Sequence, residues 1–269
     1  MPRTLTDQMD HKITLPEEPL RIVSLVPSQT ELLFALGLDE EVVGITKFCV
    51  HPEEQFRSKP RIGGTKEVKL DKIHELKPNL IIGNKEENTE EDIRALQEHY
   101  PVWMSDINTL NDALEMIRSV GLITGQEAAA EQLAGQIRRE FSFLRTEVAS
   151  QPPVRAAYVI WRKPYMVAGG GTFIHHVMDQ AGFRNVFAHQ ERYPKIPLEE
   201  IAMQEPEVIL LSSEPYPFRD KHLKEFEIMC PTAQIELVDG ELFSWYGNRL
   251  LHSGKYLRRL REKLSPSVG

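Results

Sequence analysis

The sequence predicts an α/β protein of two lobes, each with a mostly parallel sheet flanked by helices, bridged by one long helix. One observation is the stretch from Gly125 to Ser150, where apolar residues recur every three or four positions, as on an amphipathic helix. Another is a pair of similar segments at 70–82 and 198–210, each with leucine, an acid, isoleucine, proline and an apolar run. Strand and helix patterns also alternate around these segments, which favours parallel sheets.

The long helix divides the chain into three predicted parts. Pro152 and Pro153 end it, because proline cannot continue a helix and restricts the residue before it. At about 1.5 Å per residue, roughly 24 residues form a rod of about 36 Å. We therefore predict one lobe at 1–124, the bridging helix at 125–151 and a second lobe at 152–269. An ordinary surface helix and a chance similarity of the two segments are the alternatives.

The first lobe alternates strands and helices from its start. Residues 1–20 are expected to form an opening hairpin or an extended arm. A short buried strand is expected from Arg21 to Val26. Ser28 and Glu31 fit a capping box, so we expect them to begin a helix that Gly37 ends. The elements expected next are a strand at 42–46, a polar loop at 53–69, a helix and a strand within 70–84, a helix at 90–99, a strand at 102–104 and a helix from 109 to 120.

The second lobe repeats this alternation after the long helix. Residues 155–161 predict a strand, and three consecutive glycines occupy the loop behind it. Thr172 is expected to cap a helix that Gly182 ends. After the second repeated segment we expect a loop with Pro215 and Pro217, a strand at 235–238, a loop at 243–246 and a closing helix at 249–264.

The composition excludes several classes of protein. A net charge of −8 and a pI near 5.7 argue against a nucleic-acid partner, which needs a basic surface. No apolar run reaches the length of a membrane span, and the N-terminal residues show no apolar core of a secretory signal. The protein is therefore expected to be cytoplasmic as written, unless a leader is missing from the sequence. Two cysteines, Cys49 and Cys230, are too few for a disulfide framework and are expected to be buried thiols. We also expect the protein to be a monomer.

The common motifs of enzyme chemistry are missing from the sequence. The triple glycine at 169–171 lacks both the Gly-Lys-Ser/Thr of a phosphate-binding loop and the spacing of a dinucleotide site, so it predicts a turn. His175 and His176 are adjacent and would point about 100° apart on a helix, unlike a metal-binding pair. No nucleophile elbow or triad stands out. We therefore expect no catalytic residues, no metal site and no intrinsic cofactor.

Aromatic residues are concentrated in the loops between the predicted elements. In open α/β sheets, ligands bind outside the carboxyl ends of the strands, where aromatic rings offer flat apolar surface. Each ring alone is more simply a packing residue, whereas together they favour a ligand site. The aromatics in question are Phe48, Trp161, Tyr193, Trp245 and Tyr246, and the cations in the same loops are Lys47, Lys66, Lys85, Arg162, Lys163 and Arg249.

Several segments resemble the substrate-binding proteins of ABC importers for vitamin B12, iron-siderophores and haem. The similarity runs through residues 21–31, 43–45, 60–64, 76–82 and 174–187 and the second repeated segment. It implies two α/β lobes on one long helix, with a metal chelate or corrinoid held in the cleft between them. Thr65 and Asn84 stand where the B12-binding members would have tryptophan, which leaves the ligand class open.

The loops and the resemblance together define the candidate residues. The ligand-binding candidates are Phe48, Lys66, Asn84, Trp161, Tyr193, Trp245, Tyr246 and Arg249. The resemblance also implies that Asp71 and Glu199, at matching positions of the repeated segments, dock onto arginines of a membrane permease. An acid near a helix N-terminus is also favoured by the helix dipole, and both roles can hold together.

Three functions therefore remain open at this point. The first is a non-enzymatic binder of a small molecule that serves an ABC permease. The second is a cytoplasmic carrier, sensor or enzyme that acts on a related cofactor with the same scaffold. The third is a protein-interaction module without a small ligand.

Overall fold

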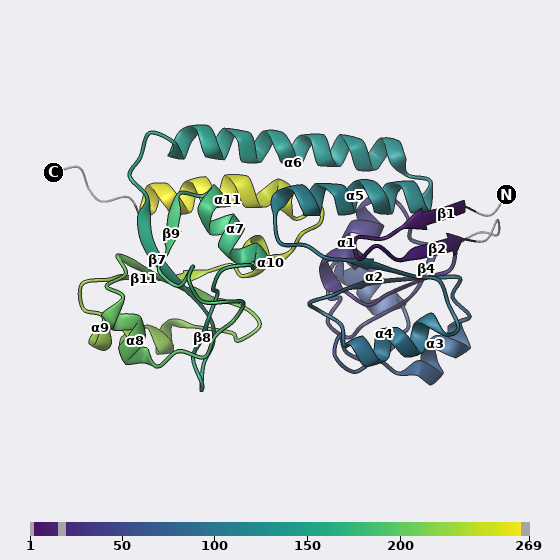
Figure 1. Ribbon diagram of the computed structural model, residues 1–269, viewed down its shortest axis with the longest axis horizontal. Coiled ribbons are helices and arrows are strands. Elements are labelled where there is room, and N and C mark those ends of the chain that lie inside the picture. Colours follow the sequence, from purple (N-terminus) through teal and green to yellow (C-terminus); the bar gives the residue numbers. More distant parts are fainter. Residues whose placement is uncertain (1–2, 16–19, 265–269) are drawn as a thin grey trace. The chain divides into compact units, whose positions relative to one another are not determined.

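The computed structural model describes residues 3–15 and 20–264 (Figure 1), which leaves 1–2, 16–19 and 265–269 of the predicted arm and lobes outside it. The chain divides into two compact units. Unit 1 comprises Met1–Ile107, Asn111–Gln136 and Tyr246–Asn248, and unit 2 comprises Asn108–Leu110, Ile137–Trp245 and Arg249–Gly269. Each unit contains a mostly parallel sheet flanked by helices, which confirms the predicted fold class. The predicted lobe boundaries stay predictions.

The sheet of unit 1 has four parallel strands in the order β4-β3-β5-β6. Every residue of β5 and β6 is buried, as the uninterrupted apolar runs of a parallel sheet require. A separate antiparallel hairpin opens the unit, as predicted. The strands are β1 (Arg3–Thr6), β2 (Lys12–Leu15), β3 (Ile22–Ser24), β4 (Val42–Ile45), β5 (Leu80–Asn84) and β6 (Val102–Ser105).

Two predictions for the helices of unit 1 are wrong. The first helix begins at Pro27, whose fixed φ suits a first helical position, so Ser28 lies inside the helix and the predicted capping box does not form. The predicted loop at 53–69 contains a short helix with two acids in its first turn. The helices are α1 (Pro27–Ala35), α2 (Glu53–Ser58), α3 (Leu70–Leu76), α4 (Glu90–Gln97) and α5 (Leu110–Thr124).

The predicted long helix is α6 (Glu127–Val148), and it contributes residues to both units. In unit 1 its first turns pack closely on α5 at Gly121. A Cβ atom added to Gly121 would lie 2.3 Å from the Cβ of Ala130, so only glycine permits this approach. Further along, in unit 2, Ile137, Phe141 and Leu144 of α6 are buried.

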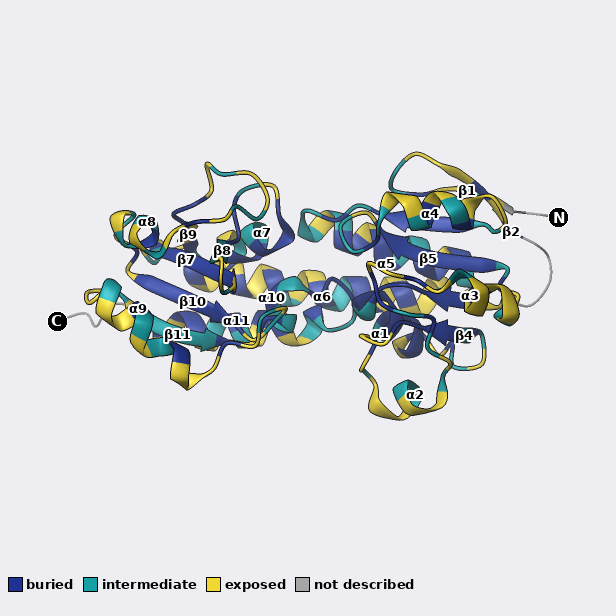
Figure 2. Ribbon diagram, turned by 90° about the horizontal axis from the view of Figure 1, so that it is seen from below, coloured by how far each residue is buried: buried dark blue, intermediate teal, exposed yellow. Residues whose placement is uncertain are grey.

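The sheet of unit 2 has the order β11-β10-β7-β8, and β9 pairs with the first half of β7. All pairs are parallel except β7 with β8. Figure 2 shows β7 and β10 as buried strands, with exposed residues on the outer faces of the helices. The strands are β7 (Val154–Trp161), β8 (Met166–Val167), β9 (Phe183–Asn185), β10 (Val208–Ser212) and β11 (Gln234–Val238).

The helices of unit 2 include two that the sequence did not predict. One follows the loop with Pro215 and Pro217, and the other lies where a loop was expected at 243–246. Thr172 caps its helix as predicted, since its hydroxyl accepts from the N–H of His175. The helices are α7 (Phe173–Gln180), α8 (Leu198–Met203), η1 (Asp220–His222), α9 (Leu223–Met229), α10 (Glu241–Ser244) and α11 (Leu250–Lys263).

The triple glycine is a site of close backbone contact. The N–H of Gly169 donates to the carbonyl of Arg192 at 2.7 Å, and that of Gly170 donates to the carbonyl of Gln190 at 2.7 Å. A Cβ on Gly169 would lie 2.4 Å from the carbonyl oxygen of Gln190. Gly169 and Gly170 therefore serve close chain packing, with Gly170 in a β-bridge to Glu191, and only Gly171 lies in the predicted turn.

Both cysteines are free and buried, as predicted. Burial raises the pKa of each thiol, although hydrogen bonds with Thr30 and Thr46 oppose this for Cys49. None of the helices in the described part of the chain is long and apolar enough to span a membrane.

Candidate functional site

The loop after β4 places an exposed aromatic ring at the carboxyl edge of the unit 1 sheet. Phe48 is 50% exposed, and the ammonium of Lys47 lies 5.1 Å from the centre of its ring. Both side chains pack against Gly64, where an added Cβ would lie 3.2 Å from the Phe48 ring. The glycine therefore supports a flat apolar surface with a positive charge beside it.

Asn84 ends β5 at the same edge, and its side chain is used within unit 1. Its amide nitrogen donates to the hydroxyl of Ser105 at 3.0 Å, and its oxygen accepts from the N–H groups of Glu86 and Glu87. The side chain is 1% exposed. These contacts favour a structural role for Asn84, which holds the turn from Lys85 to Asn88, over direct contact with a ligand.

That turn also positions charged side chains of unit 1. Lys66 donates to the backbone carbonyl of Glu86, while Lys85 pairs with Asp106 at 2.5 Å. Burial, and then the neighbouring Glu86, raise the pKa of Glu87, whereas Lys66 opposes this shift. Lys66 is exposed, so its charge remains available at this edge.

In unit 2, an aromatic pair lies at the carboxyl end of β7. Trp161 is the last residue of the strand and is 38% exposed. Tyr216, in the loop after β10, packs edge-on against it with ring centroids 5.8 Å apart. Tyr216 also packs on Phe218 at 4.8 Å, so the pair rests on the core. Sequence reasoning missed Tyr216, although its place after a strand and between two prolines was a usable signal.

Arg162, the next residue along, is fixed by a bidentate ion pair. Two of its nitrogens donate to the two carboxylate oxygens of Glu225, each at 2.8 Å, and both side chains are partly buried. The hydrogen bonds with Arg162 lower the pKa of Glu225, although burial opposes this shift. The same hydrogen bonds raise the pKa of Arg162. The positive charge of Arg162, which the sequence suggested for ligand binding, is thus neutralised by Glu225 within unit 2.

The remaining aromatic candidates differ in exposure. Trp245 and Tyr246 are 8% and 6% exposed, so little of either ring is accessible. Arg249 lies 4.8 Å from the Trp245 ring and pairs with Glu241 at 2.6 Å. The contacts of Arg249 with Trp245 and Glu241 stabilise the stretch after α10. Tyr193 is half-buried, with the guanidinium of Arg192 6.0 Å from its ring centre.

The two predicted docking acids occupy equivalent positions in the two units. Asp71 lies in the first turn of α3 and Glu199 in the first turn of α8, and both are exposed. Each short helix leads into a buried strand, β5 in one unit and β10 in the other. The N-terminal half of the helix dipole favours an acid at such a position.

A further feature of the two sheet edges is the distribution of their metal-binding side chains. In the part of the chain that the structure covers, no three histidine, cysteine, aspartate or glutamate side chains gather in a way that could hold an ion. The arrangement offers instead exposed rings, backbone turns and a few cations.

Known proteins share both the sequence pattern and the fold. A vitamin B12-binding protein of Vibrio cholerae is 27% identical over 194 residues, which cover 71% of this chain and 70% of that protein. Among solved structures, the periplasmic vitamin B12 binding protein BtuF of Vibrio cholerae has a TM-score of 0.79 at 23% identity and covers 91% of this chain and 98% of its own. The periplasmic heme-binding protein RhuT from Roseiflexus sp. RS-1 also gives 0.79, at 24% identity, with 92% and 98% covered.

The sequence also matches the periplasmic binding protein family over residues 22–229. This match begins at β3 and ends with α9, so it includes the sheet strands of unit 1 and most of those of unit 2. The chain therefore belongs to the periplasmic binding protein family.

Proposed function

We propose that the chain is the substrate-binding component of an ABC-type importer, and that its ligand is a metal chelate or corrinoid such as cobalamin, haem or an iron-siderophore. Members of its family are binding proteins, and two of the similar proteins described above are named as vitamin B12-binding and heme-binding proteins. We further propose that the ligand is bound and released unchanged, without catalysis.

The exposed Trp161 at the carboxyl end of β7 carries this proposal. A large side chain that is 38% exposed leaves apolar surface in water, which is unfavourable unless a partner covers it. Tyr216 holds the ring from one side by an edge-on contact. A planar macrocycle could stack on the open face of such a ring, because stacking of large aromatic surfaces adds to simple area burial.

Phe48 supports the same ligand class from unit 1. Its ring is 50% exposed and has the ammonium of Lys47 beside it. The exposed Lys66 adds a second positive charge at this edge. Apolar surface next to cations suits a ligand that combines a large flat body with carboxylate groups. We propose Phe48, Lys66 and Trp161 as direct contacts.

The first test is calorimetric titration of the purified protein with cobalamin, haem and a ferric siderophore. Trp161→Ala should weaken binding of the cognate ligand at least tenfold, about 1.4 kcal/mol, because the variant loses the exposed ring surface. Phe143→Ala is the matched control, since Phe143 is 59% exposed on α6 of the same unit. An unchanged affinity in Trp161→Ala would remove this residue from the site.

The bound ligand also distinguishes a binder from an enzyme. Mass spectrometry of the ligand recovered after prolonged incubation should show the starting compound. Conversion of the ligand would support instead the cytoplasmic enzyme considered above.

A further inference from the structure

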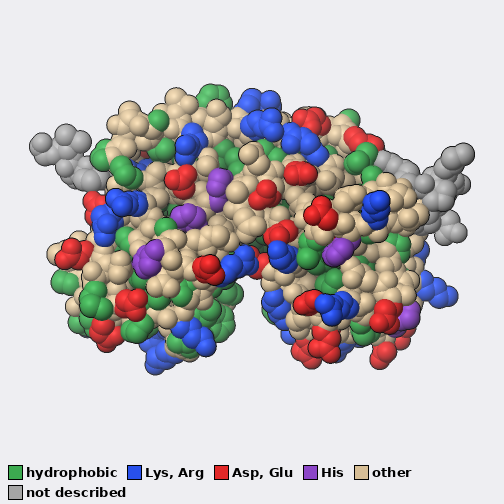
Figure 3. Space-filling model, in the orientation of Figure 1, with side chains coloured by type: hydrophobic (Ala, Val, Ile, Leu, Met, Phe, Trp, Pro, Cys, Tyr) green, Lys and Arg blue, Asp and Glu red, His purple; other side chains and the backbone are tan. Residues whose placement is uncertain are grey.

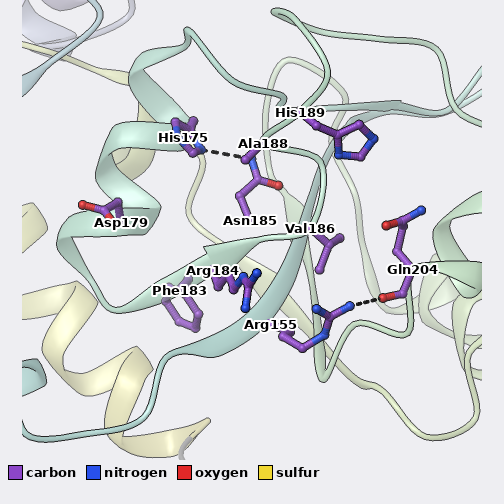
Figure 4. A pocket seen from close by; sticks show the side chains of 10 residues that line it. All are labelled: Arg155, His175, Asp179, Phe183, Arg184, Asn185, Val186, Ala188, His189 and Gln204. Atoms are coloured by element: carbon purple, nitrogen blue, oxygen red, sulfur yellow. Dashed lines mark hydrogen bonds between the residues drawn. The ribbon is translucent and has the colours of Figure 1, made fainter.

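Unit 2 contains a pocket that lies far from Trp161, the proposed ligand contact in the same unit. It has a volume of about 420 Å³, and ten residues line it (Figure 4): Arg155, His175, Asp179, Phe183, Arg184, Asn185, Val186, Ala188, His189 and Gln204. Arg155 is the second residue of β7 and Trp161 is the last. At about 3.3 Å per residue, the strand separates the two positions by roughly 20 Å.

The pocket is unusually rich in cationic and hydrogen-bond-donating side chains for an acidic protein. Two arginines and two histidines line it against one acid, whereas the whole chain has a net charge of −8. That acid, Asp179, pairs with Arg145 at 3.2 Å. Figure 3 shows histidine side chains grouped on this face of unit 2, around α7 and β9. Among the side chains that line the pocket, arginines therefore outnumber acids by two to one.

The two arginines are direct neighbours across a strand pair. Arg155 of β7 and Arg184 of β9 are register partners in a parallel ladder. Like charges opposite each other on neighbouring strands are destabilising unless a counter-charge lies close to both. An anion with two or more oxygens would provide that charge, because planar guanidinium groups bind such anions in bidentate fashion.

The partners of the two arginines are unequal. Arg155 donates to the carbonyl of Gln204 at 2.5 Å and to that of Glu205 at 3.4 Å, so it caps the end of α8, and its own backbone N–H donates to the carboxylate of Glu207. Arg184 is exposed, and its guanidinium has no hydrogen bond or ion pair with the residues that the structure describes. The guanidinium N–H groups of Arg184 are therefore available to donate to a ligand.

A histidine on the opposite wall has its donor atom defined by a buried asparagine. Asn185 is 6% exposed, and its oxygen accepts from the N–H of Phe187, which fixes its amide orientation. Its nitrogen therefore donates to the carbonyl of Ala168 and toward Nδ1 of His175 at 3.3 Å. With Nδ1 as acceptor, the neutral ring carries its proton on Nε2 and offers a second donor.

We propose that this pocket binds a small oxyanion, either a phosphate-bearing or a polycarboxylate compound, independently of the ligand of the proposed importer function. Arg184 and Arg155 hold the anion between them, and His175 and His189 donate from the facing wall. The volume suits a small metabolite, since ligand pockets commonly range from about 300 to 1,000 Å³.

The test is calorimetry of the full chain with inorganic phosphate and, separately, citrate, at constant ionic strength set with chloride. We expect saturable binding of one of them with a dissociation constant below about 1 mM. Arg184→Gln should weaken it at least tenfold. Arg259→Gln, which removes an exposed charge from α11 of the same unit, should leave it unchanged. Binding of phosphate alone or of citrate alone would identify the anion class.

A second measurement uses only the wild-type protein, so its result does not depend on whether the variants fold. Titration of the wild-type protein, followed through the side-chain Nε–H signals of arginine by NMR, should shift those of Arg184 and Arg155 with the same dissociation constant. No saturable binding of either anion, or an equal loss in Arg184→Gln and Arg259→Gln, would overturn the proposal. Neither measurement uses cobalamin or haem, so a negative result would reject the anion site without contradicting the proposed importer function.

Discussion

The ion pair of Arg162 with Glu225 joins the end of β7 to α9, two segments of unit 2 that are 63 residues apart. Both side chains are only about a quarter exposed, so water screens the pair weakly. Glu225→Gln should lower the free energy of unfolding by about 1–3 kcal/mol at pH 7, because the bidentate charged hydrogen bonds are lost. Urea unfolding followed by tryptophan fluorescence measures this difference.

The same pair gives a pH dependence whose sign follows from the pKa of Glu225. Arg162 lowers that pKa in the folded state, so the carboxylate adds stability above its unfolded pKa, and this stability is lost as the pH falls through the folded value. The difference between wild type and Glu225→Gln should therefore shrink below about pH 4. Arg145→Gln is the control, since its partner Asp179 is 65% exposed and the pair should contribute less than about 1 kcal/mol. A constant difference down to pH 3 would contradict this account.

Single residues were the hardest feature to predict from the sequence. The pattern placed Trp161 and Phe48 at the ends of strands, and both are exposed, although Trp161 is the last residue of β7 and does not lie in a loop. It could not show that Arg162 meets Glu225, because that contact depends on the tertiary position of an unpredicted helix. For the same reason, the burial of Trp245 became evident only from the folded chain.

At the level of elements, the contact between α5 and α6 in unit 1 depends on one missing side chain. Gly121→Ala gains helix propensity of about 1 kcal/mol, yet its Cβ would lie 2.3 Å from that of Ala130. We expect net destabilisation of about 1–2 kcal/mol in thermal or urea unfolding, because overpacking of a close contact usually costs more.

Two further variants test the origin of that effect. Ser119→Ala in the same helix should change stability by less than about 0.5 kcal/mol. The double change of Gly121→Ala with Ala130→Gly should lose less than the sum of the single changes, since it restores the space between the helices. Strict additivity would show that the contact is not the cause.

The elements themselves were largely predictable, and the misses share a physical cause. Buried runs such as those of β5 and β10 carry a strong local signal, and so does the periodic face of α6. The missed β9 has three residues and α10 has four, too few for any period to show. At the start of α1, the conformation of Pro27 outweighed a capping pattern.

At the level of the whole molecule, the proposed partnership with a permease rests on Asp71 and Glu199. Both are exposed and occupy the first turns of equivalent helices. Reversal of both charges to lysine should abolish association with the permease in liposomes or nanodiscs, because each lost ion pair becomes a repulsion. Affinity for the small ligand should stay within about twofold.

The control reverses two other exposed acids, Glu54 on α2 and Glu227 on α9, by the same charge. This variant has the same net charge and should still associate. Association that survives the change of Asp71 and Glu199, or that is lost equally in both variants, would refute specific docking by these two residues.

The short stretch Tyr246–Asn248 belongs to unit 1, although it follows every strand of unit 2 in the chain. Gly247 lies against α1, where an added Cβ would be 2.7 Å from the carbonyl oxygen of Ser28. Chains emerge from the ribosome N-terminus first, and domains usually fold in that order. Here the first unit to emerge acquires the stretch 246–248 only after every strand of unit 2 has been synthesised, so unit 1 cannot complete its folding before those strands have left the exit tunnel.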